Sequence, residues 1–344
     1  MRELRSREVR IRSLASGISH GTELSLYRGS SAFAERTFDR ELRAFVPAGG
    51  GPSVYPAGLG YELVGRVEEV GDAVNELASG ALVHVGAPHG DEAIVDLDAT
   101  RGTTYPLVQL PEDGTSLDTW LFVSLGAVAL VAVHDAQVKV GDRVVVVGLG
   151  AIGLMVVQLA RLAGAARVTA IDSVGSRREL AARLGADAVI DPAEAEPEGG
   201  AGVVSKSLAG GADVTIETSG ATAGLQTAIA AAGMGSRVVA VGFYQGGAAD
   251  LRLGEEWHHN RLDMVSSMGA WGNLHRNHPA WDRPRVLQTV VELLHSSRLS
   301  VGRFPVRRFP FSEASTAYAW LDAHPSEALK VALVYDCTTK GGEQ

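Results

Sequence analysis

Residues Val144–Gly153 read Val-Val-Val-Val-Gly-Leu-Gly-Ala-Ile-Gly, and they give the strongest indication of the fold class. The four valines, Val144–Val147, predict a short strand that is buried on both of its faces. The apolar spacing over Ala151–Ala163 predicts a helix directly after it. A strand and a helix joined by a glycine-rich turn form the first half of a βαβ unit.

The three glycines of this turn each meet a different steric demand. Gly148 permits a tight turn, Gly150 lets the backbone approach a pyrophosphate, and Gly153 allows the helix to pack closely on the strand. The positive end of the helix dipole and the free N–H groups of Ala151 and Ile152 then face the anion. The pattern predicts a dinucleotide site. On the glycines alone, a packing turn in some other α/β unit stays open as the alternative.

An acidic residue lies where a dinucleotide site needs one. Asp172 follows the next predicted strand, Val168–Ile171, and comes 19 residues after Gly153. A carboxylate at this place accepts hydrogen bonds from the ribose hydroxyls of the adenosine half. It also repels a 2′-phosphate, so we expect NAD(H) rather than NADP(H) as the cofactor. Arg177 lies near enough to reach such a phosphate, although a solvated helix face is the simpler interpretation.

The regions around this unit differ in their pattern of predicted strands and helices. Strand-like and helix-like runs alternate over residues 123–267, which predicts a doubly wound parallel sheet and a Rossmann dinucleotide-binding domain. Residues 1–122 contain short β-like runs between glycine and proline turns, which predicts a β-rich domain. Residues 268–344 combine two predicted helices with a closing strand. We expect this last region to complete the first domain.

Composition excludes several classes of protein. The chain has 344 residues, a hydrophobic fraction of 46% and a formal net charge of −9. An acidic chain without a basic block is a poor partner for nucleic acid or for an anionic membrane. No apolar stretch reaches the ~20 residues of a membrane span, and no signal peptide is visible, so we expect a cytoplasmic protein. The single cysteine, Cys337, excludes an intrachain disulfide and any zinc site that needs two thiolates.

The chain resembles the medium-chain dehydrogenase/reductase superfamily of alcohol dehydrogenase-like enzymes. The resemblance is carried by the glycine turn, by Gly60–Val67 (GYELVGRV), by Asp213–Gly220 (DVTIETSG) and by Val238–Phe243 (VVAVGF). It implies an α/β fold in which a GroES-like β-rich catalytic domain accompanies the Rossmann domain. By analogy it also implies a homodimer or homotetramer that associates through the outer Rossmann strand, here Leu262–Ser267.

Loops at the carboxyl ends of Rossmann strands line the cofactor crevice. Several residues of this chain follow predicted strands of that domain and are therefore candidate cofactor contacts. They are Ser219, Gly242, Phe243, Tyr244 and Gly269.

Within the superfamily, the chain looks most like the zinc-free branch that includes bacteriochlorophyllide dehydrogenases. The segment Ser16–Glu23 (SGISHGTE) and the tyrosine of Gly60-Tyr61-Glu62 carry this likeness. Zinc-dependent members hold their metal at positions that match Ser19 or His20, Tyr61 and Ser124. Hydroxyl and phenol groups are poor zinc ligands, so we expect no metal in this protein.

Carbonyl reduction without a metal needs another group to stabilise the charge that develops on oxygen. We predict that Tyr61 is the acid/base group or the oxyanion donor, that His20 aids it, and that Ser19 and Thr22 lie around it. The alternative is that Tyr61 only fills the space of the metal. We expect Glu62 to be a structural acid that pairs with a basic residue.

These features together predict a metal-independent oxidoreductase that transfers a hydride between NAD(H) and an alcohol/carbonyl pair. The substrate is expected to be a small molecule, such as a polyol, a sugar or a secondary-metabolite intermediate. Two alternatives stay open: an NAD(P)H-dependent enone or quinone reductase that acts on a conjugated C=C bond, and a dinucleotide-binding protein without catalytic activity.

Overall fold

The computed structural model of the chain describes residues 2–39, 41–48, 58–101, 105–193, 208, 210–245, 247–268 and 280–336. The chain forms two compact units. The first consists of Met1–Leu121 together with Phe304–Gln344, and the second consists of Phe122–Arg303.

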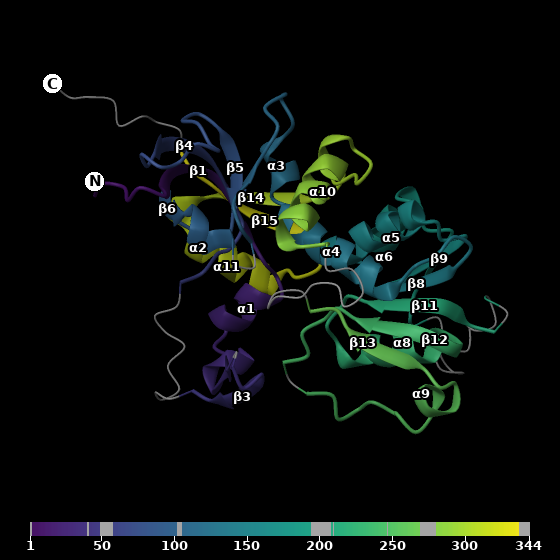
Figure 1. Cartoon of the computed structure of the whole chain (residues 1–344). Helices are drawn as coiled ribbons and strands as arrows, with labels where there is room; N and C mark the ends of the chain where they lie inside the picture. The colour runs from purple at the N-terminus through teal and green to yellow at the C-terminus, as the bar shows by residue number, and fades with distance from the viewer. Residues whose placement is uncertain are drawn as a thin grey trace. The chain divides into compact units, whose positions relative to one another are not determined.

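The second unit contains a six-stranded sheet in which every neighbouring pair of strands is parallel. The strands lie in the order β10 (Ala188–Ile190), β9 (Arg167–Ile171), β8 (Arg143–Val147), β11 (Ala212–Glu217), β12 (Ala232–Ala240) and β13 (Asp263–Ser266), as Figure 1 shows. The chain builds outward from β8 to β10 and then returns to the other side of β8. The order therefore reverses between β8 and β11, and such a switch point is where doubly wound sheets bind ligands.

Helices of this unit connect and cover its strands. They are α4 (Val123–Ala136), α5 (Ala151–Ala163), α6 (Gly175–Arg183), α8 (Thr222–Ala231), α9 (Glu256–His259) and α10 (Arg283–His295). Helix α5 has the predicted bounds because Gly150 precedes it and Gly164, with φ of 105°, ends it in the left-handed conformation. A core of aliphatic residues, among them Val145 and Ile229, holds the sheet and helices together.

The boundary of the second unit at Arg303 differs from the expected domain boundary at residue 268. The reason is that α10 packs against α4. A Cβ on Gly126 of α4 would lie only 2.6 Å from Cγ1 of Val290 in α10. Gly126 and Val290 are 164 positions apart in the chain, so no local sequence pattern predicts this contact.

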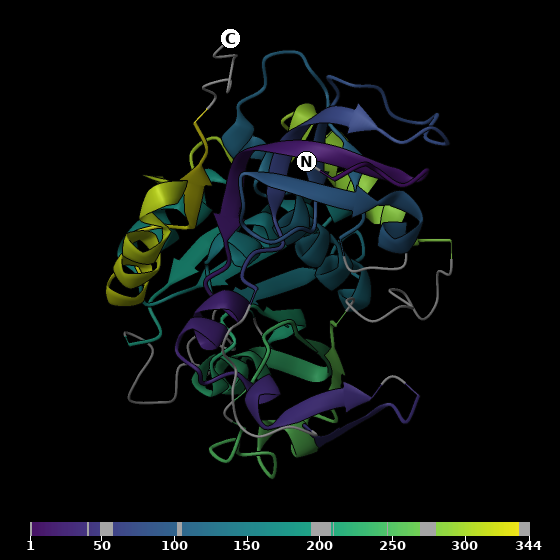
Figure 2. The same ribbon diagram turned by 90° about the vertical axis from the view of Figure 1, so that its left-hand side faces the viewer.

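The first unit contains a seven-stranded, mixed sheet. Its order is β14 (Val306–Pro310), β15 (Lys330–Val334), β1 (Glu8–Ile18), β4 (Leu63–Val70), β5 (Leu82–Val85) and β7 (Val108–Gln109), and β6 (Glu92–Asp96) also pairs with β1. The long strand β1, drawn in purple, runs across this sheet (Figure 2). Because β15 pairs with β1, segments from both ends of the chain build one unit. The mixed sheet and the parallel sheet confirm the predicted α/β fold class.

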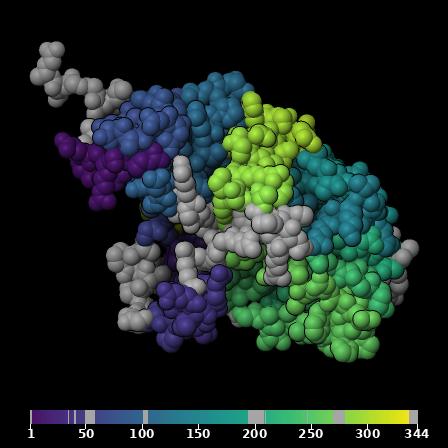
Figure 3. Space-filling view, in the orientation of Figure 1, coloured from purple at the N-terminus to yellow at the C-terminus, as the bar shows by residue number. Residues whose placement is uncertain are grey.

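Short helices complete the first unit. They are α1 (Thr22–Tyr27), α2 (Leu97–Arg101), α3 (Leu117–Trp120) and α11 (Ala314–Ala323), with the 3₁₀ turns η1 (Ala32–Ala34) and η2 (Phe311–Glu313). A separate hairpin of β2 (Arg36–Asp39) and β3 (Ala44–Pro47) stands at the surface as a small lobe (Figure 3). Over the described residues, no helix is both long enough and apolar enough to traverse a bilayer.

Candidate active site

The glycine turn of the second unit has the geometry that its sequence predicts. Gly148 has φ of +86°, and a Cβ there would lie 2.6 Å from the backbone nitrogen of Ser219. A Cβ on Gly153 would lie 1.9 Å from the carbonyl oxygen of Gly148, so the helix touches the turn directly. A Cβ on Gly150, by contrast, would have no atom within 4 Å. Gly148 and Gly153 thus serve internal packing, whereas Gly150 borders open space.

The first turn of α5 is available to an anion. Gly150 provides no side-chain cap, and the first N–H groups of a helix, here those of Ala151 and Ile152, have no intrahelical acceptor. The helix dipole adds a partial positive charge at this end. These groups fit the diphosphate of a dinucleotide.

Asp172 lies at the end of β9 beside this turn. One carboxylate oxygen accepts a hydrogen bond from the N–H of Leu149 at 2.6 Å, and the other accepts one from the N–H of Val174 at 2.8 Å. Asp172 therefore holds the glycine turn in place, which the sequence did not indicate. Each carboxylate oxygen has a further lone pair, so hydrogen bonds from ribose hydroxyls remain possible. Arg177 follows in α6 and is partly buried.

A buried carboxylate that sequence reasoning missed organises the loops after β11 and β12. Glu217 is fully buried. Its Oε1 accepts the backbone N–H of Ser219 at 2.6 Å and also the Ser219 hydroxyl, and its Oε2 accepts the hydroxyl of Tyr244. Burial, followed by the hydrogen bond to Glu217, raises the pKa of Tyr244 well above its ordinary value. Glu217 therefore joins two loops at the carboxyl edge of the sheet.

The other candidate cofactor contacts lie in the same two loops. Gly242 lies against Gly220, because a Cβ at Gly242 would be 2.3 Å from the Cα of Gly220. Phe243 is 49% exposed, so about half of its surface is accessible on this loop. Gly269 lies outside the described residues.

In the first unit, Tyr61 precedes β4 and is partly buried. Its ring stacks on Tyr105 with centroids 5.2 Å apart and planes 9° apart. Burial and then the negative charge of Glu62 raise the pKa of Tyr61 well above its ordinary value. The phenol therefore stays protonated and acts as a donor.

Glu62 forms the ion pair that the sequence analysis expected. It is fully buried and accepts a hydrogen bond from the ammonium of Lys330 on β15, which is also buried. Gly17 of β1 leaves room for this pair, since a Cβ there would lie 2.4 Å from Cε of Lys330. The prediction of a structural acid at Glu62 is confirmed.

The remaining predicted site residues differ in placement. Ser19 is buried, and His20 next to it is partly buried. Thr22 is exposed at the start of α1, and no described hydrogen bond joins it to Tyr61. Ser124 is buried in α4 of the second unit.

These residues do not fit a zinc ion. Zinc in proteins is held by thiolate, imidazole or carboxylate groups. Here the matching positions offer hydroxyl groups, one partly buried imidazole and a phenol whose raised pKa opposes the phenolate form. Among the described residues, no group of three or more His, Cys, Asp or Glu side chains could hold a metal ion.

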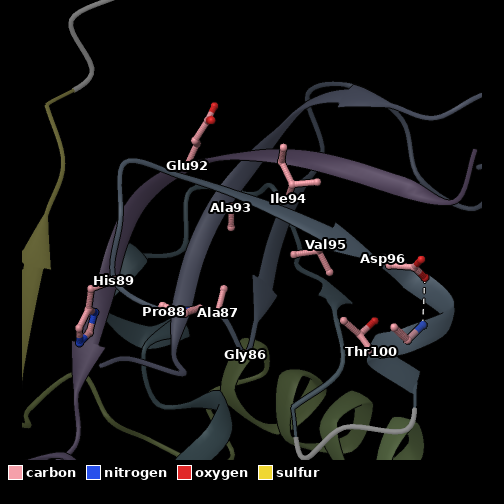
Figure 4. Close-up of a pocket in the computed structure, with 11 residues that line it drawn as sticks. Gly86, Ala87, Pro88, His89, Glu92, Ala93, Ile94, Val95, Asp96 and Thr100 are labelled. Carbon is pink, nitrogen blue, oxygen red and sulfur yellow. Dashed lines mark hydrogen bonds between the residues drawn. The ribbon is translucent and has the colours of Figure 1, made fainter. Parts of the chain in front are cut away.

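A cavity of about 350 Å³ lies elsewhere in the first unit and is lined by His89 and by strand β6, among others. Ala93 and Val95 point to one face of β6, whereas Glu92 and Ile94 point to the other (Figure 4). The imidazole of His89 is already bonded to Glu23 and Ser16. Because its lining is largely aliphatic, this cavity offers little for catalysis.

A six-stranded parallel sheet with a glycine-rich turn in one unit and a β-rich mixed sheet in the other are the architecture of alcohol dehydrogenase-like oxidoreductases. Comparisons with known proteins agree with this class. Residues 151–282 match the family described as zinc-binding dehydrogenase. The D-guloside 3-dehydrogenase of Shigella flexneri is 33% identical over 344 residues, which cover 97% of this chain and 95% of that protein.

Two further proteins are similar. The (R,R)-butanediol dehydrogenase of Bacillus subtilis is 31% identical over 185 residues, which cover 48% of this chain and 52% of that protein. A putative zinc-binding dehydrogenase from Sinorhizobium meliloti, whose structure was solved bound to NADP, has a TM-score of 0.73 and 21% identity. The match covers 97% of this chain and 94% of that one.

The chain therefore belongs to the zinc-binding dehydrogenase family within the alcohol dehydrogenase-like superfamily, as its sequence motifs predicted. It is a dehydrogenase by family. It differs from zinc-dependent members at the positions that hold the metal, where this chain has Ser19 or His20, Tyr61 and Ser124.

Proposed function

We propose that the protein is a metal-independent dehydrogenase that interconverts a secondary alcohol and a ketone in a sugar or polyol, with NAD(H) as its cofactor. The partly buried phenol of Tyr61, which stacks on Tyr105, carries this proposal. Burial keeps the phenol protonated and therefore a donor, and Tyr61 matches a position that holds the metal in zinc-dependent members.

The dinucleotide would be held by the glycine turn, the start of α5 and Asp172. When bound, it supplies or accepts the hydride. Gly150 offers the open space for the pyrophosphate, and the first N–H groups of α5 offer donors. NAD(H) is favoured because Asp172 places a negative charge where a 2′-phosphate would lie. Glu217 fixes two loops, and Phe243 is exposed on one of them. These loops support binding of the nicotinamide half of the dinucleotide.

Tyr61 has one chemical role in either direction of the reaction. Its O–H donates a hydrogen bond to the substrate oxygen, which carries negative charge in the transition state. In carbonyl reduction the phenol gives its proton to that oxygen and regains one from solvent. General acid catalysis of this kind contributes about 10²–10⁴-fold in rate.

The relatives support the substrate class. One is named for oxidation of a guloside and another for butanediol, and each name denotes a substrate with a secondary hydroxyl. The likeness to the bacteriochlorophyllide branch stays a prediction from sequence motifs.

The test is turnover of a panel of glycosides, free sugars and polyols with NAD⁺ and with NADP⁺, followed by cofactor absorbance. We expect activity that resists chelators in protein without bound zinc. Tyr61→Phe should lower kcat by about 10²–10⁴-fold while the dinucleotide Kd is unchanged. Stoichiometric zinc whose removal stops turnover, or full activity of Tyr61→Phe, would overturn the proposal.

Reduction of a conjugated C=C bond is the second candidate. The same protonated phenol of Tyr61 would stabilise the enolate oxygen that forms in such a reaction. Product analysis with an enone separates the two activities. A saturated ketone indicates C=C reduction, and an allylic alcohol indicates carbonyl reduction.

We also propose a homodimer or homotetramer through β13. This strand is one of the two edges of the parallel sheet, and Met264 on it is 37% exposed. Analytical ultracentrifugation of Met264→Lys tests this, because a charge on the edge strand should favour the monomer.

A further inference from the structure

The carboxylate of Glu217 is a fully buried acid at the carboxyl edge of the parallel sheet, where it ends strand β11. Its Oε1 accepts the backbone N–H groups of Ser219 at 2.6 Å and of Gly220 at 3.1 Å, and it also accepts the Ser219 hydroxyl. Its Oε2 accepts the hydroxyl of Tyr244 from the loop after β12. Both carboxylate oxygens are therefore held by donors.

These partners keep the carboxylate charged. Backbone N–H groups, such as those of Ser219 and Gly220, can only donate, and they bind an ionised oxygen best. A buried carboxylate that accepts several hydrogen bonds retains its charge without the cost of an unsatisfied group. All of these partners are uncharged, so they orient Glu217 without cancelling its negative charge.

Two glycines provide the space that the carboxylate occupies. A Cβ on Gly224 would lie 2.9 Å from Oε1 of Glu217, and a Cβ on Gly242 would lie 3.0 Å from Oε2. The carboxylate therefore lies directly against the backbone of α8 and of the loop after β12. A side chain at either glycine would displace it.

The strand order brings these loops to the nicotinamide half of a dinucleotide. Asp172, the expected acceptor for the ribose of the adenosine half, follows β9, and the glycine turn follows β8 (Figure 1). Strands β11 and β12 lie on the other side of β8, so a dinucleotide that runs from Asp172 across the turn continues toward their loops. The turn and the first loop are in contact, because the hydroxyl of Thr218 donates to the carbonyl oxygen of Gly148 at 2.7 Å.

The two redox forms of the cofactor differ in charge at the nicotinamide alone. The oxidised ring carries one positive charge and the reduced ring is neutral, whereas the diphosphate is the same in both. A negative charge in the protein interior attracts a cation more strongly than it would in water, because the effective dielectric constant is lower. Its repulsion of the diphosphate cancels in the ratio of the two dissociation constants.

We propose that Glu217 is a specificity-determining residue whose charge favours binding of NAD⁺ over NADH. NAD⁺ is the form that oxidation of an alcohol consumes, so this preference loads the protein for oxidation of a sugar or polyol. The inference rests on the dinucleotide site of the proposed function. It gives Glu217 a role in cofactor selection in addition to holding the two loops.

The first test is Glu217→Gln, which removes the charge and keeps the shape. The amide oxygen can still accept the N–H of Ser219, and the amide nitrogen can donate to the phenol oxygen of Tyr244. We expect the ratio of the Kd for NAD⁺ to the Kd for NADH to rise about fivefold to tenfold, and tenfold corresponds to about 30 mV in the potential of the bound two-electron couple. Fluorescence titration with NADH, followed by competition with NAD⁺, measures both constants. Equal changes in the two constants would indicate a purely structural role and overturn the proposal.

The second test is Tyr244→Phe, which removes a donor and keeps the charge. Without the O–H dipole of Tyr244, the Glu217 carboxylate attracts a cation more strongly, so the same ratio should fall about twofold to threefold. A change that only loosened the loops would weaken binding of both forms alike. An unchanged or increased ratio in Tyr244→Phe would overturn the inference, and this variant decides the question even if Glu217→Gln does not fold.

The matched control is Asp213→Asn, at the amino end of the same strand, where the carboxylate pairs with Arg143. It removes one negative charge from β11 at the edge opposite to the cofactor loops. We expect the ratio of the two constants to stay as in wild type. The same rise in the control as in Glu217→Gln would assign the effect to net charge and refute the role of Glu217.

These binding measurements separate the inference from the proposed function. A ratio that rises in Glu217→Gln, in a protein that oxidises no sugar or polyol, supports the role of Glu217 and refutes the proposed reaction. Turnover of a sugar or polyol together with an unchanged ratio overturns the inference alone. Absence of binding of either NAD⁺ or NADH to the wild-type protein overturns both.

Discussion

Gly153 and Gly148 are in direct contact, since a Cβ on Gly153 would lie 1.9 Å from the carbonyl oxygen of Gly148. The same Cβ would lie 2.7 Å from the hydroxyl oxygen of Thr218. Neither separation is one that a real Cβ can adopt. Helix α5 therefore begins with no room for a methyl group between it and the turn.

Gly153→Ala should displace α5 from the sheet. We expect it to lower the free energy of unfolding by about 1–3 kcal/mol, the usual cost of overpacking, and to weaken dinucleotide binding as a consequence. Urea unfolding and a fluorescence titration with NADH measure the two effects. Wild-type stability in Gly153→Ala would contradict the described contact.

Gly150→Ala should behave in the opposite way. Its Cβ would meet no atom within 4 Å, and its φ of −67° suits alanine. We expect stability to stay within about 0.5 kcal/mol of wild type and NADH binding to weaken at least about tenfold, because the methyl group occupies the space of the pyrophosphate. Unchanged binding would place the dinucleotide elsewhere.

Asp172 is expected to determine the choice of cofactor. Asp172→Ser removes the charge but keeps an oxygen that can accept the N–H of Leu149, which is now bonded to the carboxylate at 2.6 Å. We expect the ratio of the Kd for NADPH to the Kd for NADH to fall about tenfold or more, that is about 1.4 kcal/mol. Isothermal titration calorimetry with both cofactors measures the ratio.

The matched control for this change is Glu179→Gln on α6, where the side chain is 71% exposed. It removes one negative charge from the same helix region without contact to the turn. The same fall in the control as in Asp172→Ser would assign the effect to overall charge and not to the position of Asp172.

The parts of the fold that sequence predicted are those whose evidence is local. The valines of β8, the glycine turn and the apolar face of α5 lie within 21 consecutive residues, Arg143–Ala163. The structure of this segment depends on residues that are close in sequence, so the spacing of its apolar residues and glycines is enough to predict it. The pairing of Glu62 with a basic residue was also expected, although nothing in the sequence identified Lys330.

The parts that sequence missed depend on contacts between distant segments. His89 is 66 positions from Glu23, and Tyr318 is 295 positions from it. No motif or period relates such residues, and α11 joins the first unit through the pairing of β15 with β1 and through its packing against Ile18 and Leu24. Glu217 was missed for another reason: it lies inside a motif that indicates the family, and nothing in that motif indicates its hydrogen bonds to Ser219 and Tyr244.

The buried pair of Glu62 and Lys330 makes a further prediction about stability. Lys330→Met would leave the Glu62 carboxylate buried without its cation. We expect the free energy of unfolding to fall by about 3–5 kcal/mol. The double variant Glu62→Gln/Lys330→Met removes both charges, so its free energy of unfolding should fall clearly less than that of Lys330→Met. Urea unfolding of the single and double variants measures the difference, and an equal loss in both would show that the charge of Glu62 is not what Lys330 compensates.

His84 on β5 is fully buried, and burial followed by the charge of Lys330 lowers its pKa from 6.5 to about 3. The folded state therefore keeps this imidazole neutral over a range in which the unfolded chain binds a proton. This difference in pKa sets the direction in which stability changes with pH. Stability is complete above pH 6.5 and falls as the pH drops toward 3, because the unfolded state takes up the proton.

For this one group the loss amounts to at most about 1.4 kcal/mol per pH unit, or about 2 kcal/mol between pH 6.5 and about pH 5. His84→Asn should remove that part of the pH dependence, so the difference in unfolding free energy between the variant and wild type should narrow on acidification. His259→Asn, at an exposed histidine of α9, should leave the pH dependence of wild type unchanged. Urea unfolding at several pH values over this range measures both. A difference between His84→Asn and wild type that stays constant with pH would mean that the folded protein protonates His84 as readily as the unfolded chain does.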